Sequence, residues 1–244
     1  MIGEGLSKKN RAVESLAENG CIQRLCKHAS SEFPCLLLCP TCLRACFVTA
    51  AYATYGERNF TYMKETVERA RAWSCEPKKP GERGKRPRLK RDYDSAIGDF
   101  PCRTFNLSEQ SVSSPHTDQN NLAQGWCSIT PLGNFDPRRG GHLVLWDFGL
   151  VIQFPPGATA LIPSALICHS NATIQPHEVR FSIVQYASGR IFRWVNNGCS
   201  TDKAWFENAT PQAIEARNKE KARRWANAAR SYSTQEELLG TGQK

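Results

Sequence analysis

The chain has 244 residues, of which 40% are hydrophobic and 23% charged, and its formal net charge is +9. This length is enough for one domain with a helical wrap, and the positive charge is compatible with a nucleic-acid partner. Eleven cysteines is an odd number and the N-terminus lacks the apolar region of a signal peptide, so we expect reduced thiols in the cytosol or nucleus, not a secreted, disulfide-bonded protein.

The first 75 residues predict helices. Apolar residues recur at helical spacing, with charges between them, over Glu14 to Leu25 and over Asn59 to Trp73. Leu36 to Tyr55 is about twenty residues long and mostly apolar, which is the length of a membrane span. Pro40 and Arg44 within it favour a buried helix of a soluble protein, so we expect no membrane partner.

Four cysteines lie close together in this first part: Cys35, Cys39, Cys42 and Cys46. Four thiols can ligate a structural zinc ion, and Cys39 and Cys42 have the spacing of a zinc knuckle. The residues around them are apolar, however, and a free cysteine in such surroundings behaves as a small hydrophobic side chain. We favour burial in a helix over a zinc site.

A strongly basic segment follows. Glu76 to Arg91 contains eight Lys or Arg against two Glu, a net charge of +6. Such a segment cannot bury a core, and its Pro and Gly residues predict a loop. The loop can neutralise the phosphates of a nucleic acid, serve as a nuclear localisation patch, or act only as a solvated linker.

Short apolar runs separated by Gly and Pro clusters predict strands from residue 101 onward. Many short strands with this punctuation indicate a sandwich or jelly roll. The expected strands are Arg103–Leu107, Gly125–Pro131, Gly141–Asp147, Leu150–Phe154, Ala158–Ile162 and Glu178–Tyr186.

The motif that carries chemistry is His116-Thr117-Asp118. If Ser111 to Pro115 leads into it as a strand, the side chains of His116 and Asp118 share one face and can hold one metal ion. Alone, a His-x-Asp is more often a surface histidine beside an acid. His169, at the end of an apolar run, can supply a third ligand, and two histidines with one carboxylate form the facial triad typical of non-haem Fe(II) enzymes.

Arg180 and Ser182 lie two residues apart in the last predicted strand, so both side chains can reach one carboxylate. A structural arginine on an edge strand is the alternative. The ordered set of His-x-Asp, distal His and Arg-x-Ser resembles the Fe(II)/2-oxoglutarate-dependent dioxygenase superfamily on its double-stranded β-helix. The resemblance implies that Arg180 and Ser182 hold the far carboxylate of 2-oxoglutarate. By similarity to the AlkB branch, Asn106 would contact the same cosubstrate, although Asn106 is also suited to capping a turn.

Within this superfamily, residues 104–198 resemble the TET/JBP-like branch, especially its fungal members associated with mobile elements. The segments that carry the resemblance are Trp126–Pro137, Gly140–Asp147, Phe154–Gly157, Ile162–Ala165 and His169–Asn171. It implies oxidation of a methylated base in DNA, 5-methylcytosine and/or N6-methyladenine, with O2 as co-reactant and release of succinate and CO2. We expect a nuclear location.

A base inside a duplex must be flipped out to reach a buried iron. Trp126, Trp146 and Phe148 are candidates for stacking on the flipped base, but core packing explains them equally well. Polar side chains suited to reading a base edge are His142, Asp147 and Asn171.

Pro211 to Tyr232 predicts a C-terminal helix, with Thr210 as its cap and Pro211 in its first turn. Its basic residues would face solvent or a phosphate backbone, and we expect a supporting helix. The residues expected to pack on the core are Ile214, Ala222, Trp225 and Ala229.

Together these patterns predict an α+β protein with a mainly β core. We expect a helical region over residues 1–75, a basic linker over 76–100, a jelly roll over 101–200 that the resemblance implies is a double-stranded β-helix, and a C-terminal helix and tail over 201–244, in a monomer. Three other functions stay open: a 2-oxoglutarate-dependent hydroxylase of a protein or small molecule, a non-enzymatic DNA-binding module, and an inactive mobile-element copy.

Overall fold

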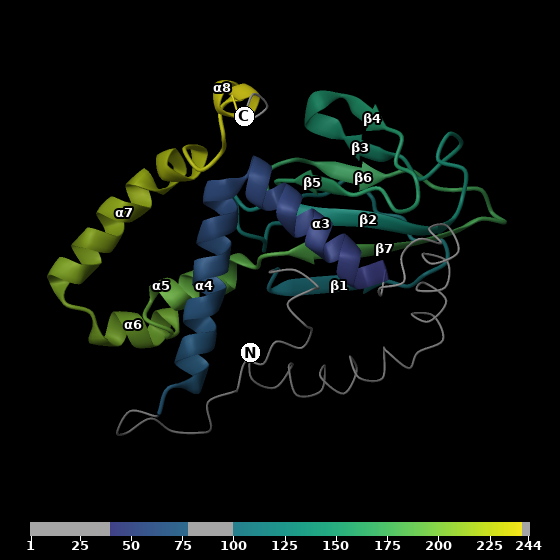
Figure 1. Cartoon of the computed structure of the whole chain (residues 1–244). Coiled ribbons are helices and arrows are strands. Elements are labelled where there is room, and N and C mark those ends of the chain that lie inside the picture. The colour runs from purple at the N-terminus through teal and green to yellow at the C-terminus, as the bar shows by residue number, and fades with distance from the viewer. Residues whose placement is uncertain (1–39, 78–99, 241–244) are drawn as a thin grey trace.

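The computed structural model describes residues 40–77 and 100–240 (Figure 1). Helices pack beside two antiparallel sheets, so the fold is α+β, as predicted. The helix predicted over Glu14–Leu25, most of the basic segment, and Cys35 and Cys39 lie outside the described residues.

In the described residues, helices come first in chain order, strands follow, and helices come last. The first two helices are α3 (Pro40–Tyr55) and α4 (Glu57–Cys75). The strands are β1 (Cys102–Asn106), β2 (Cys127–Asn134), β3 (Leu143–Leu145), β4 (Leu150–Ile152), β5 (Ala160–Ile162), β6 (His169–Asn171) and β7 (Val179–Tyr186), with a 3-10 turn, η2 (Trp146–Phe148), between β3 and β4. The last helices are α5 (Gly189–Asn196), α6 (Asp202–Asn208), α7 (Pro211–Ala229) and α8 (Gln235–Gly240).

The strands form a four-stranded sheet in the order β1-β7-β2-β5 and a three-stranded sheet in the order β4-β3-β6. All pairs are antiparallel. The long strand β7 pairs with β1 on one side and β2 on the other, which places Ser182 opposite Asn106 and opposite Pro131. The centre of the larger sheet is thus built around the Arg-x-Ser motif.

One predicted strand is absent. Residues 111–115 form no ladder, and only isolated bridges flank them, between Gln110 and Arg180 and between His116 and His169. The prediction of a strand over Ser111–Pro115 is therefore wrong. The segment is held through side chains instead: Asn171 Oδ1 accepts from the backbone N–H of Ser113 (2.9 Å) and from its hydroxyl (2.8 Å).

The largest core cluster joins the helices to the four-stranded sheet. Tyr52 of α3 is fully buried, and its ring stacks on Trp126 at 5.2 Å between centroids and on Phe100 at 5.6 Å. The Tyr52 hydroxyl accepts a hydrogen bond from the backbone N–H of Trp126 (3.0 Å), so the buried phenol oxygen has a partner. Met63 of α4 and Phe192 of α5 complete the cluster.

The apolar segment Leu36–Tyr55 was predicted to be a buried helix, and α3 occupies its described part, with Val48 and Tyr52 in the core. None of the helices in the described residues combines the length and apolar character needed to cross a membrane.

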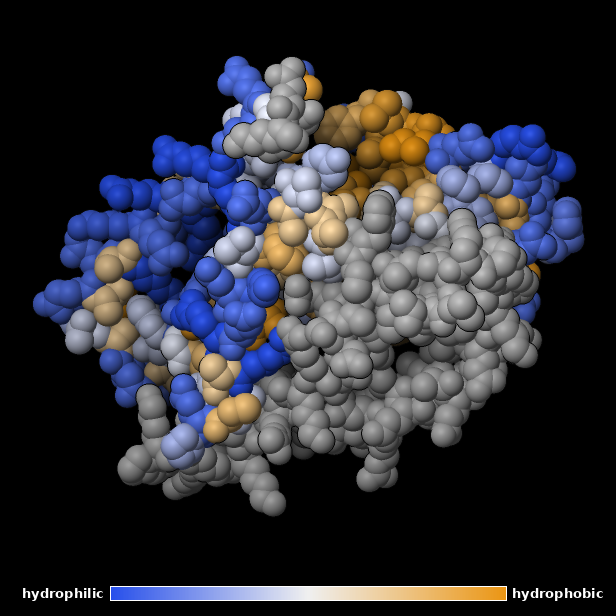
Figure 2. Space-filling model, viewed as in Figure 1, coloured by the Kyte–Doolittle hydropathy of each residue, from blue (hydrophilic) through white to orange (hydrophobic). Residues whose placement is uncertain are grey.

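The β3–β4 hairpin is apolar on its outside. Trp146 and Phe148 at its tip are 54% and 60% exposed, so core packing, one of the two explanations considered for them, does not hold. In Figure 2 the hairpin forms the orange area at the upper right of the molecule. Trp126, the third aromatic residue of that prediction, lies in the core cluster.

The C-terminal part contains three helices that the sequence patterns did not predict: α5, α6 and α8. Helix α7 matches the predicted Pro211–Tyr232 helix, and the Thr210 hydroxyl caps it by accepting from the backbone N–H of Ala213 (3.2 Å). Its predicted packing is wrong. Ile214 is half-buried, but Trp225 is 65% exposed, and Ala222 and Ala229 are exposed as well.

Candidate metal centre

Backbone pairing brings the two distant histidines together. The N–H of His116 donates to the carbonyl of His169 (3.1 Å), and the N–H of His169 donates to the carbonyl of His116 (2.9 Å). The two rings lie 4.4 Å apart between centroids. Asp118 lies two residues after His116, and its backbone N–H donates to the Ser164 carbonyl (2.9 Å), which fixes its position.

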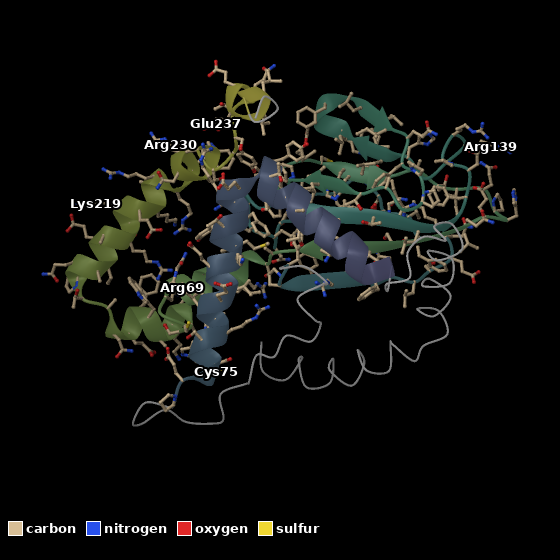
Figure 3. The ribbon with its side chains drawn as sticks, viewed as in Figure 1. Arg69, Cys75, Arg139, Lys219, Arg230 and Glu237 are labelled. Atoms are coloured by element: carbon tan, nitrogen blue, oxygen red, sulfur yellow. The ribbon has the colours of Figure 1, made fainter. Side chains whose placement is uncertain are left out.

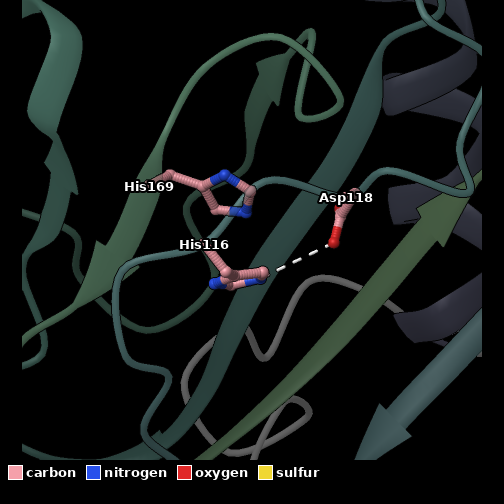
Figure 4. A group of neighbouring side chains, drawn as sticks. All are labelled: His116, Asp118 and His169. Atoms are coloured by element: carbon pink, nitrogen blue, oxygen red, sulfur yellow. Dashed lines mark ion pairs between the residues drawn. The ribbon is translucent and has the colours of Figure 1, made fainter.

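The three side chains point toward one another (Figure 4). One ligand atom from each of His116, Asp118 and His169 lies within 4.8 Å of the others, and His116 Nε2 is 3.6 Å from Asp118 Oδ1. Ligands at adjacent positions around a metal ion, each about 2.1 Å from it, are about 3 Å apart, so small rotations would close this group on one ion. His169 is 4% exposed, whereas the side chain of His116 is 41% exposed, so the group lies at the boundary of the interior and solvent.

Both imidazole rings are oriented by backbone carbonyls. His116 Nδ1 lies 2.8 Å from the Ser114 carbonyl oxygen, and His169 Nδ1 lies 2.9 Å from the Ile167 carbonyl oxygen. A carbonyl can only accept, so each Nδ1 is a donor, and the tautomer that donates from Nδ1 has its lone pair on Nε2. This second contact is the one that metal-binding histidines usually make. The donor set therefore fits a divalent transition metal.

The Asp118 carboxylate is held on its far side. Asn121 Nδ2 lies 3.1 Å from Asp118 Oδ2 and 3.2 Å from Ser164 Oγ, so the amide bridges the carboxylate and the buried serine. The contact leaves Oδ1 directed at the histidines. Sequence reasoning missed both Asn121 and Ser164, because only the fold brings Ser164 to the His-x-Asp motif.

Arg180 lies in the same cavity with an incompletely balanced charge. Its side chain is 2% exposed, and Nη1 donates to the Ser111 carbonyl (3.0 Å). Its Nε has no hydrogen-bond partner, and no carboxylate of the described residues pairs with the guanidinium. Burial alone lowers the pKa of Arg180, to about 10. A buried cation without a counter-charge is unfavourable, and an anionic ligand would remove the cost.

Ser182 and Asn106 extend this polar wall. Asn106 Nδ2 donates to Ser182 Oγ (2.8 Å) across the β1–β7 pair, where the two residues lie opposite each other. The Ser182 hydroxyl proton is then available to an acceptor in the cavity. Asn106 therefore caps no turn and instead orients the serine.

The cavity has a volume of about 610 Å³. The predicted metal ligands, the predicted cosubstrate residues Arg180, Ser182 and Asn106, and Asn171 all line it. Its apolar wall comes from Ile129, Leu143, Phe154 and Val184. The volume is in the range of small-molecule sites, and the combination of an apolar wall with a few convergent polar groups is typical of them.

The three predicted base-contacting residues are placed differently. Asn171 lines the cavity, but its amide is used by Ser113, Ser111 and Ala172. Asp147 and His142 do not line it: Asp147 Oδ2 accepts from the backbone N–H of Cys168 (2.6 Å), and His142 is half-buried before β3. The aromatic residues Trp126, Trp146 and Phe148 are also absent from the lining.

Comparisons with known proteins give little further information. No protein-family model matches the chain, and no curated protein matches it. Among solved structures, NgTET1 in complex with 5mC DNA matches at 20% identity and a TM-score of 0.35, over 57% of this chain and 52% of that chain. This chain thus spans about half the length of its match, and at this TM-score the likeness carries no argument about fold or function.

Proposed function

We propose that the protein is an Fe(II)- and 2-oxoglutarate-dependent dioxygenase that oxidises a methylated base in DNA, on a double-stranded β-helix core. The proposal is carried by one observation. A His-Asp-His group with both Nε2 atoms free of backbone contacts shares a cavity with a buried arginine that no carboxylate of the described residues pairs with. A metal ion and a dicarboxylate are the two ligands that these groups would satisfy.

In this proposal His116, Asp118 and His169 hold the metal, with Asn121 fixing the carboxylate. Arg180 and Ser182 receive the distal carboxylate of 2-oxoglutarate, and Asn106 sets the direction of the serine hydroxyl. Bound Fe(II) with 2-oxoglutarate and O2 would supply the oxidising chemistry, with succinate and CO2 as products. The chain itself supplies binding, orientation and an apolar wall that limits water.

Two features support DNA as the substrate: the net charge of +9, and the resemblance of residues 104–198 to the TET/JBP-like branch. The fungal, mobile-element type within that branch, the nuclear location and the choice between 5-methylcytosine and N6-methyladenine belong to the proposal. A base would have to leave the duplex to enter the cavity. His142 and Asp147 lie outside the lining, so a base contact by either side chain would require movement of the β3–β4 hairpin.

The test is to incubate the purified protein with Fe(II), 2-oxoglutarate and duplex or single-stranded oligonucleotides that carry each modified base. Succinate and oxidised nucleosides are measured by mass spectrometry. We expect His116→Ala and Asp118→Ala to abolish both products while the thermal unfolding profile stays close to wild type. His177→Ala, at an exposed position outside the cavity, is the matched control and should keep full activity.

The same assay separates the alternatives. Succinate formed with a peptide or small molecule but with none of the oligonucleotides would indicate a different hydroxylase. DNA binding without iron-dependent succinate would indicate a binding module or an inactive copy. Undiminished 2-oxoglutarate turnover by well-folded His116→Ala and Asp118→Ala proteins would remove the metal assignment.

A further inference from the structure

Helix α7 is attached to the rest of the protein only near its ends, within the described residues. At its start, Arg217 pairs with Asp202 of α6 (2.8 Å) and its guanidinium lies 4.4 Å from the centre of the Trp205 ring. At its end, Ala228 is buried. Residues 218–227 between these points are all exposed, although they make nearly three turns of helix.

The far attachment is made by Arg58 of α4. Its guanidinium donates to the Tyr232 carbonyl (3.1 Å) and forms an ion pair with Glu237 of α8. Arg230 and Glu237 lie together near the beginning of α4 in Figure 3. A helix held at both ends keeps a fixed course between them, so its exposed middle is presented as a rigid surface.

One face of this exposed middle is basic. Lys221, Arg224 and Trp225 follow Arg217 and precede Ala228 at spacings of three and four residues, so they lie on the face that contacts the protein at both ends. On a supporting helix this face would be apolar. We call Lys221, Arg224 and Trp225 the α7 basic face.

The cations of this face have no ion-pair partner in the part of the chain that the structure describes. Neither Lys221 nor Arg224 forms an ion pair or side-chain hydrogen bond with any described residue, whereas Lys219 pairs with Glu215 (2.7 Å). Lys219 lies on the outer side of α7 in Figure 3. Glu215 lies about half a turn from Arg224, whereas Glu220 lies one turn before Arg224 and forms no ion pair with any described residue. The face therefore presents two cations without an ion pair to any described residue, beside the large exposed side chain of Trp225.

We propose that the α7 basic face binds the phosphate backbone of duplex DNA. A polyanion matches its charge, and a helix of fixed course can follow a groove edge without reading sequence. The choice of DNA as the polyanion rests on the proposed function. The surface itself needs neither the metal centre nor the cavity, so it binds methylated and unmethylated duplexes equally.

The test is the salt dependence of DNA binding, measured by fluorescence anisotropy with a labelled duplex and with no metal ion or 2-oxoglutarate. Wild type is compared with the double variant Lys221→Gln/Arg224→Gln. Each phosphate contact contributes about 0.9 to the slope of log affinity against log salt, so the variant's slope should be shallower by about 1.8. At 0.1 M salt its affinity should be lower by about tenfold or more.

The matched control is Lys203→Gln/Lys219→Gln. It removes the same two charges from exposed helical positions, but both lysines are already paired with a glutamate on their own helix. We expect its slope of log affinity against log salt to change by less than half of the change in Lys221→Gln/Arg224→Gln. All four positions are exposed, so thermal unfolding should be unchanged in both variants.

An equal loss in the two double variants would show a general charge effect and overturn the proposal, as would an unchanged slope in Lys221→Gln/Arg224→Gln. Tighter binding of wild type to phosphatidylserine vesicles than to the duplex would overturn it in favour of a membrane surface. Failure of the proposed function looks different: the slopes then differ as expected, but no oligonucleotide is oxidised. Base oxidation with equal slopes would retain the proposed function and remove only the α7 surface.

Discussion

Replacing Arg180 by methionine tests the idea that the cavity is built for an anion. If Arg180 were a structural residue, its removal would destabilise the fold by about 3 to 5 kcal/mol, as breaking a buried ion pair does. The structure predicts a different result, because the guanidinium has one hydrogen bond to the Ser111 carbonyl and no carboxylate partner among the described residues.

The magnitude follows from the pKa of Arg180, which burial lowers to about 10. At about 1.4 kcal/mol per pKa unit, keeping the charge in the cavity costs on the order of 3 kcal/mol relative to the unfolded chain. A lowered pKa means that folding disfavours the charged form of the guanidinium, so the cost is present at every pH below about 10. It disappears only above the pKa that the same arginine has in the unfolded chain. Replacing Arg180 by methionine removes this cost and so stabilises the fold. The substitution also removes the charged hydrogen bond to Ser111, which destabilises the fold by about 1.5 to 3 kcal/mol.

We therefore expect the free energy of unfolding of ligand-free Arg180→Met, measured in urea at pH 7, to exceed that of wild type by 0 to about 2 kcal/mol. With Mn²⁺ in every sample, 2-oxoglutarate at a hundred times its Kd should stabilise wild type by about 2.7 kcal/mol. This corresponds to a rise in Tm of roughly 5 to 10 °C for a chain of this size. Arg180→Met should show almost none of this rise.

Arg190→Met is the control, because Arg190 is exposed at the start of α5 and does not line the cavity. Its response to 2-oxoglutarate should equal that of wild type. Two results would refute the reasoning. One is a loss of more than about 3 kcal/mol in ligand-free Arg180→Met, which would mean a structural arginine. The other is an equal ligand-induced rise in Tm in Arg180→Met and wild type.

Two further predictions concern the support of the site and of the sheet. Asn121→Ala should weaken Mn²⁺ binding by about tenfold to a hundredfold in calorimetry, because it releases the Asp118 carboxylate. The control Asn120→Ala should bind Mn²⁺ as wild type does. Equal affinities of the two variants would contradict the role of Asn121. Gly133→Ala should cost clearly more than the roughly 1 to 2 kcal/mol expected for Gly149→Ala, because a Cβ at Gly133 would lie 2.2 Å from the Val179 carbonyl oxygen while Gly149 has open space. Equal urea midpoints for the two glycine variants would contradict the close β2–β7 approach.

The candidate site was predictable from residue types and order. Strand periodicity put Arg180 and Ser182 on one face of β7, and the one-residue gap between His116 and Asp118 allowed them to converge. The route of the chain between the motifs was not predictable. Residues 111–115 are held by the Asn171 amide and the Arg180 guanidinium, two long-range side-chain contacts that no local pattern encodes. Ser164 became part of the site only because Asp118 bonds to its carbonyl.

Helix α7 shows the opposite case, in which a local pattern was correct and its tertiary consequence was wrong. Thr210 and Pro211 do begin a helix, but helical spacing alone assigned its inward face to packing. That face carries Lys221 and Arg224 where a supporting helix needs apolar side chains, and burying these two cations would cost several kcal/mol because neither forms an ion pair with a described residue. The helix therefore stands free between Arg217 and Ala228. Its middle contributes almost no buried surface to the fold, so the charges there are explained by what the protein binds and not by what holds it together.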